Sequence, residues 1–247
     1  MPELAMLSVD GSTATLTLNR AEKRNALSRE MLGALMARLD ELSRMDAVSS
    51  CIVTGAGASF CAGMDLKAVL RDREGVRKLL AMIAEFTIGL RGLPMPTIAR
   101  VNGAAIGGGC GIVGVCDIAV THPEAKLGYP EVDLGVCPAV VAPWLVAKVG
   151  AGRARRVLLE GGTMSGTRAL EMGLVSEVVA KDELDGRVEA IAAKFAKAGL
   201  NAVRATKKLL NELDGAGMHA AVRKGAALSA EVVSGDEAQG RLGPLFG

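Results

Sequence analysis

The chain has 247 residues, half of them apolar, and its 29 lysines and arginines against 27 aspartates and glutamates leave a net charge of +2. A charge this close to zero disfavours nucleic acid as a partner, and an aromatic content of 2% leaves few rings on which bases could stack. The longest apolar stretch, residues 136–146, is short for a membrane span and contains two prolines. The N-terminus carries acids and no long apolar run, so we expect a cytoplasmic protein without a signal peptide or a membrane segment.

Cysteine and histidine are sparse. The five cysteines include no C-x-x-C pair, which is typical of small buried apolar residues in a reducing compartment. The two histidines, His122 and His219, offer little from which to build a metal site or a Ser-His-Asp triad. We therefore predict no metal centre.

The first half of the chain alternates strand and helix signals. Two alternating β-branched runs flank Asp10-Gly11-Ser12 and predict a β-hairpin. Ser28 is a suitable N-cap for a helix that reaches about Ser43, because its apolar residues recur at helical spacing. The run 50–55 predicts a buried strand, and a second amphipathic helix follows over 76–86.

The middle of the chain continues this alternation. A strand at 97–101 is turned by Asn102-Gly103 and leads through a glycine-rich segment into a helix at 110–116; short strands follow around 118–120 and 125–127. Helices then dominate, at 151–159, 167–172, 183–198, 202–213 and 219–233. We therefore predict a single α/β core, residues 1–180, in which a strand, strand, helix motif repeats about three times, followed by a helical region, residues 181–247.

The glycine-rich segment "IGGGCGIVG", residues 106–114, has the G-x-G-x-x-G spacing of a dinucleotide-binding loop, with Glu131 close to the distance at which that fingerprint places its acid. The context differs, because the fingerprint belongs to the first strand-to-helix turn and Pro130 interrupts any strand before Glu131. Free N–H groups at a helix start stabilise negative charge, either of a phosphate or of a transient oxyanion. A second glycine turn, residues 61–65, also joins a strand to a helix.

Four segments in order resemble the signature segments of the crotonase superfamily, the enoyl-CoA hydratase/isomerase family. They are "NRAEKRNALS" (19–28), "VTGAGASFCAGMDLK" (53–67), "PTIARVNGAAIGGGCGIVGVCDIAV" (96–120) and "LGYPEVDLGVCPA" (127–139), and residues 154–179 fit the helices that follow. The resemblance implies a crotonase-like spiral of repeated β-β-α units with a helical C-terminal extension. It further implies that this extension serves oligomerisation and covers the active site in a homo-oligomer, a trimer or a dimer of trimers.

The resemblance also implies an acyl-CoA thioester substrate and an enolate formed at its carbonyl. The backbone N–H groups of Met64 and Gly108 would hold the enolate oxygen, and Glu131 would transfer the proton. The acyl group would meet an apolar wall formed by Met64, Leu66, Val69, Leu70 and Trp144.

The coenzyme part of the substrate would lie along residues 21–27 and 61–67, so no separate cofactor is implied. Lys23, Arg24 and Lys67 are the candidates for its phosphates, since flexible cations suit that task. The same turn would contribute Ala62, Gly63, Asp65 and Leu66.

One departure concerns the reaction. Typical hydratases carry a second glutamate at the position of Gly111. We therefore expect 3-enoyl-CoA isomerisation to be at least comparable to hydration, and an acid at position 111 to favour hydration; alternatively, Gly111 leaves room for a bulkier acyl group. Two other functions stay open: a non-catalytic acyl-CoA-binding or scaffold member of the family and, remotely, a dinucleotide-dependent oxidoreductase.

Overall fold

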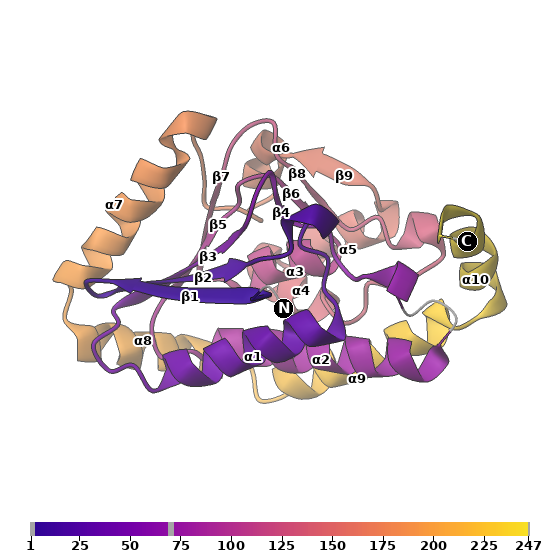
Figure 1. The fold of residues 1–247 in the computed structure, drawn as a ribbon, viewed down its shortest axis with the longest axis horizontal. Helices are drawn as coiled ribbons and strands as arrows, with labels where there is room; N and C mark the ends of the chain where they lie inside the picture. Colours follow the sequence, from indigo (N-terminus) through magenta and orange to yellow (C-terminus); the bar gives the residue numbers. More distant parts are fainter. Residues whose placement is uncertain (1–2, 69–71, 247) are drawn as a thin grey trace.

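A computed structural model describes residues 3–68 and 72–246. The larger of its two sheets has six strands and runs through the centre of the molecule (Figure 1). β1 pairs with β2 in antiparallel fashion, and every later pairing in this sheet is parallel. In spatial order the strands are β1 (Ala5–Asp10), β2 (Thr13–Leu18), β3 (Ser50–Gly55), β5 (Thr97–Arg100), β7 (Ile118–Thr121) and β10 (Glu177–Val178).

The smaller sheet contains the strands that the larger one skips. Its order is β4 (Ser59–Cys61), β6 (Ala104–Ile106), β8 (Lys126–Gly128) and β9 (Thr163–Ser165), with β4, β6 and β8 parallel. Each turn of the chain therefore adds one strand to the large sheet, one to the small sheet, and then a helix. The three turns end in α2 (Arg73–Gly92), α3 (Gly108–Val115) and α4 (Ala142–Val149), which is the predicted spiral of β-β-α units.

One layer of helices lies below the sheets in Figure 1 and consists of α1 (Arg29–Ser43), α2 and α9 (Met218–Val233). α1 begins where the sequence predicts, because the Ser28 hydroxyl accepts a hydrogen bond from the Met31 N–H. α2 and α9 pack along each other and bury apolar residues from both halves of the chain, among them Ile83 and Val222. The C-terminal region is thus joined to the core that carries the glycine turns.

The remaining helices complete the C-terminal half: α5 (Ala151–Glu160), α6 (Gly166–Glu171), α7 (Leu184–Lys197), α8 (Leu200–Leu213) and α10 (Asp236–Phe246). α7 covers the opposite face of the large sheet, where Leu184, Val188 and Ile191 meet the strand residues Ile52, Ile98 and Val120. Within the described residues, none of the helices combines the length and the apolar character needed to span a membrane.

The predicted hairpin, helices and central strands are confirmed, with ends shifted by a few residues. The sequence did not predict the three-residue strands β4, β6 and β9, which are too short to show a period of two. It also missed α4, whose first turn holds Pro143, a place where proline fits because its missing N–H would have no helical partner.

Candidate active site

The candidate residues lie at one edge of the small sheet. β4, β6 and β8 are adjacent and parallel, so their carboxyl ends meet at the same edge. Met64 follows β4, Gly108 follows β6 and Glu131 follows β8. The topology therefore brings together the three residues that the sequence singles out for chemistry.

The turn after β4 is held in place by the segment before α1. The Ala62 N–H donates to the Arg24 carbonyl at 2.9 Å, the Leu27 N–H to the Gly63 carbonyl at 2.7 Å, and the Asp65 N–H to the Leu27 carbonyl at 3.0 Å. In this parallel pairing the Met64 N–H faces away from Leu27. Among the described residues it donates no hydrogen bond, so the amide is available to a ligand.

The turn after β6 presents a second amide. Gly107 has a positive φ of 53°, which favours glycine, and its N–H donates to the Gly128 carbonyl at 2.8 Å. Gly108 is the first residue of α3, and within the described chain its N–H finds no partner, as expected for the first turn of a helix. A methyl group placed on Gly63 would come within 3.6 Å of the Gly108 nitrogen, so the two turns lie against each other.

Glu131 completes this group. A methyl group on Gly107 would lie 2.8 Å from Glu131 Oε1, and the buried Oε2 has no hydrogen-bond partner among the described residues. Burial raises the pKa of Glu131 to about 7, because the charged carboxylate loses its hydration. A carboxyl group with this pKa exchanges a proton near neutral pH, as a general acid or base requires.

The loop that carries Glu131 is fixed from both sides. The Val136 N–H donates to the Glu131 carbonyl at 2.8 Å, and the Gly162 N–H at the start of β9 donates to Asp133 Oδ2 at 2.8 Å. Asp133 is therefore engaged in holding the loop. It is exposed, so its environment does not resemble that of the buried Glu131 carboxyl oxygen Oε2.

Two buried or partly buried polar residues support the Met64 turn and were not identified from the sequence. Arg20 Nη1 donates to Asp65 Oδ2 at 2.6 Å. The fully buried Asn25 donates its amide N–H groups to the carbonyl of Ala56, before β4, and to carbonyls of β4 itself, including Ser59 at 2.8 Å. Both belong to the "NRAEKRNALS" segment. This segment has several polar residues, and the sequence does not indicate which of them point inward. One carboxylate oxygen of Asp65 is thus held by Arg20, and its backbone N–H is held by Leu27.

The three candidate cations lie on the two segments joined by this pairing. Lys23 and Arg24 are exposed beside the turn at η1 (Ala21–Lys23), and Lys67 is exposed in η2 (Leu66–Ala68). Ala62 and Leu66 are partly buried in the same turn. Of the expected acyl wall, Met64 and Leu66 pack on the core, while Val69 and Leu70 lie outside the described residues.

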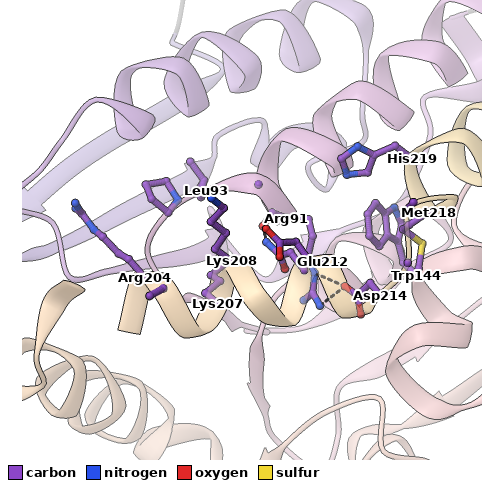
Figure 2. Close-up of a pocket in the computed structure, with 16 residues that line it drawn as sticks. Arg91, Leu93, Trp144, Arg204, Lys207, Lys208, Glu212, Asp214, Met218 and His219 are labelled. Carbon is purple, nitrogen blue, oxygen red and sulfur yellow. Dashed lines mark hydrogen bonds and ion pairs between the residues drawn. The ribbon is translucent and has the colours of Figure 1, made fainter. Parts of the chain in front are cut away.

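Trp144, the remaining member of the expected wall, lies in a different place. Its indole N–H donates to Thr87 Oγ1 at 3.1 Å, and its ring borders a cavity of about 700 Å³ between the end of α2, α8 and the start of α9. Figure 2 shows Trp144 and Met218 at one end of this cavity and Arg204 at the other, with Arg91 joined to Asp214 between them. None of the expected catalytic or coenzyme-binding residues lines it.

The space beside Gly111 also differs from expectation. A methyl group on Gly111 would lie 2.3 Å from Val141 Cγ1, so the expectation that Gly111 leaves room for a bulkier acyl group is wrong. A glutamate at position 111 would meet Val141, so Val141 would have to shift to admit it; that an acid there favours hydration stays a prediction.

The described residues contain no cluster of histidine, cysteine and acidic side chains that would hold a metal ion. The candidate residues bring together two backbone amides without a partner among the described residues and one carboxyl group with a buried oxygen. Such a set has the chemistry to stabilise an oxyanion and to move a proton.

Comparison with known proteins identifies the family of this chain. The family model described as enoyl-CoA hydratase/isomerase matches residues 9–239. A putative enoyl-CoA hydratase of Thermus thermophilus is 36% identical, covering 90% of this chain and 89% of its own. A short-chain-enoyl-CoA hydratase of Clostridium acetobutylicum is 34% identical, covering 83% of this chain and 80% of its own.

Solved structures agree. The enoyl-CoA hydratase of Mycobacterium smegmatis is 32% identical with a TM-score of 0.83 and covers 91% of this chain and 90% of its own. An enoyl-CoA hydratase/isomerase from Mycobacterium paratuberculosis is 26% identical with a TM-score of 0.90 and covers 99% of both chains. The chain belongs to the enoyl-CoA hydratase/isomerase family of the crotonase superfamily, and its activity is of that general type.

Proposed function

We propose that this enzyme forms an enolate from acyl-CoA thioesters, with the N–H groups of Met64 and Gly108 holding the enolate oxygen and Glu131 transferring the proton. The observation that carries the proposal is the position of the Glu131 carboxyl group, buried against the Gly107 turn beside two free amides. Each amide aimed at an oxyanion typically contributes about 3–4 kcal/mol of transition-state stabilisation.

The coenzyme lies across the paired segments 21–27 and 61–67 in this proposal. Lys23, Arg24 and Lys67 are exposed there and are suited to the phosphates, whereas the backbone of Ala62, Gly63, Asp65 and Leu66 lines the path toward Met64. The enzyme then needs no cofactor beyond the coenzyme of its substrate.

The reaction that suits one carboxyl group is a 1,3-proton shift, because the same group serves first as base and then as acid. Burial raises the pKa of Glu131, and a hydrogen bond to its own backbone partly offsets this rise. No charged group contributes to the shift. We therefore propose that 3-enoyl-CoA isomerisation is at least comparable to hydration of 2-enoyl-CoA. Hydration is the second candidate, favoured by the names of the relatives, several of which are called hydratases.

Turnover of matched 2-enoyl-CoA and 3-enoyl-CoA thioesters, with products identified by mass spectrometry, tests the proposal. Hydration adds the mass of water, whereas isomerisation leaves the mass unchanged and moves the double bond. Tight binding of the thioesters without either product would favour the non-catalytic alternative. Quenching of NADH fluorescence by the protein would favour the dinucleotide alternative.

We also propose a homo-oligomer, a trimer or a dimer of trimers. Leu209, Leu210 and Leu213 on one side of α8 are 54%, 54% and 72% exposed. Three leucines at this spacing form a continuous apolar stripe on the helix, and such a stripe is typical of a protein–protein contact. A cytoplasmic location stays an expectation from the sequence.

A further inference from the structure

Gly111 and Val141 form a closed apolar contact beside the candidate site. A methyl group on Gly111 would lie 2.3 Å from Val141 Cγ1 and 3.0 Å from Val141 Cβ. Val141 is fully buried at the N-cap of α4. The side chain of Val141 therefore fills the space that a side chain at position 111 would enter.

The C-terminal region prevents Val141 from moving away. The Ser229 hydroxyl of α9 donates to the Cys137 carbonyl at 2.7 Å and accepts from the Val140 N–H at 3.3 Å. A methyl group on Gly225 would lie 2.1 Å from the Ala139 carbonyl oxygen, so α9 packs directly on this loop. α9 thus holds the residues directly before Val141 in place.

This contact lies close to the Glu131 carboxyl group. The Gly111 N–H donates to the Gly107 carbonyl at 2.8 Å, which places Gly111 one helical turn, about 5.4 Å, beyond the residue that Glu131 touches. Gly107 thus faces the Glu131 carboxyl group, and Gly111, one turn further along α3, faces the isopropyl group of Val141, which offers a water molecule no hydrogen bond.

We propose that Val141 determines the specificity of the reaction by closing the place from which a second polar group would hold water near the substrate. This inference rests on the proposed function. In the favoured reaction the Glu131 carboxylate takes a proton from C2 of a 3-enoyl thioester, and the C–H electron pair becomes part of a dienolate. The protonated Glu131 then returns the proton to C4, the double bond moves to C2–C3, and neither water nor a redox partner takes part.

Water addition needs more than this shift. The oxygen of water must be held and activated at C3 while a proton reaches C2, and one carboxyl group faced by an apolar wall does these tasks poorly. A carboxylate at position 111 would supply the second polar group, provided that the side chain of residue 141 is small enough to admit it.

The test compares Gly111→Glu, Val141→Gly and the double variant Gly111→Glu/Val141→Gly, with Gly111→Gln/Val141→Gly as the matched neutral control. We expect Gly111→Glu alone to lose thermal stability and activity, and the double variant to regain folding and to raise the ratio of hydration to isomerisation at least tenfold. The control should fold without that rise. The inference would be overturned if the folded, active double variant had the same ratio of hydration to isomerisation as the unmodified enzyme. It would also be overturned if the Gly111→Glu single variant were stable and hydrated as well as the double variant.

A second measurement keeps the test decisive should the double variant fail to fold. Gly111→Ala adds only the colliding methyl group, and Val141→Ala removes the atom that it meets. We expect Gly111→Ala to lower the melting temperature and Val141→Ala to restore it in combination, while Val141→Ala alone raises the hydration fraction. Equal product ratios for Val141→Ala and the unmodified enzyme would overturn the inference. Absence of turnover in the unmodified enzyme would instead overturn the proposed function.

Discussion

In the proposed mechanism, the ionisation of Glu131 links stability to catalysis. Its folded-state pKa of about 7 lies above the ordinary value of 4.5, so ionisation is disfavoured in the folded state. The contribution of Glu131 to stability is complete below pH 4.5 and is lost as the pH rises through 7. Each pKa unit corresponds to about 1.4 kcal/mol, so the loss reaches about 3 kcal/mol at pH 8.

Glu131→Gln should therefore raise the free energy of unfolding relative to the unmodified protein by up to about 3 kcal/mol at pH 8 and leave it nearly unchanged at pH 4. Denaturant unfolding at the two pH values measures this difference. Glu189→Gln, at an exposed position on α7, is the matched control and should show no such pH dependence. Equal effects of the two substitutions would mean that Glu131 is not buried in solution.

A substitution at Met64 distinguishes the role of its backbone amide from that of its side chain. Met64→Ala keeps the N–H group, so kcat should fall less than tenfold, whereas Glu131→Gln should lower it about 10²–10⁴-fold. Steady-state kinetics on one enoyl-CoA substrate compares the two variants. If Met64→Ala were as inactive as Glu131→Gln while still folded, the backbone assignment would be wrong.

At the scale of elements, the site depends on how the ends of three short strands are held together. Arg20, at the end of β2, bonds to Asp65 and so ties the large sheet to the turn that presents the Met64 amide. Both side chains are mostly buried, at 19% and 15% exposed, so the pair is poorly screened by solvent. The turn would shift without it.

Arg20→Gln should lower kcat by about 10²-fold, because a displacement of about 1 Å in the catalytic geometry has effects of this size. The pH at which activity is half-maximal should stay near 7, since Glu131 is untouched. Arg44→Gln removes a highly exposed ion pair on α1 and serves as the control, with no expected effect on kcat. A pH profile that moved with Arg20→Gln would show that Arg20 acts on Glu131 instead of on the turn.

At the scale of the whole molecule, the C-terminal helices would connect the proposed oligomer contact to the candidate site. α9 packs on the loop before Val141, and α8 carries the exposed leucine stripe on its outer side. Substituting Leu209 and Leu213 with serine should reduce the oligomer to smaller species, as measured by sedimentation velocity. Lys194→Ser on the exposed face of α7 is the control. An unchanged sedimentation coefficient for the leucine variant would exclude α8 as the main contact.

Strand and helix periods predicted most of the long elements, because they are local signals, and the family resemblance of the ordered motifs implied the spiral core. The same resemblance singled out Met64, Gly108 and Glu131, which the structure places at one edge of the small sheet. It did not predict that Val141 fills the space beside Gly111, nor that Trp144 borders a separate cavity, since both depend on how α4 packs against α3 and α2. Arg20 and Asn25 escaped notice for the same reason. Their burial depends on a pairing between segments about 40 residues apart.

The central claim is that Glu131 moves a proton at the carbon next to the thioester while two amides hold the enolate. Deuterium exchange into C2 of a saturated acyl-CoA in D₂O, followed by mass spectrometry, tests this claim without water addition or double-bond movement. The unmodified enzyme should incorporate deuterium, and Glu131→Gln should lose this exchange by at least 10²-fold while still binding the thioester. Exchange at the same rate in both proteins would contradict the account.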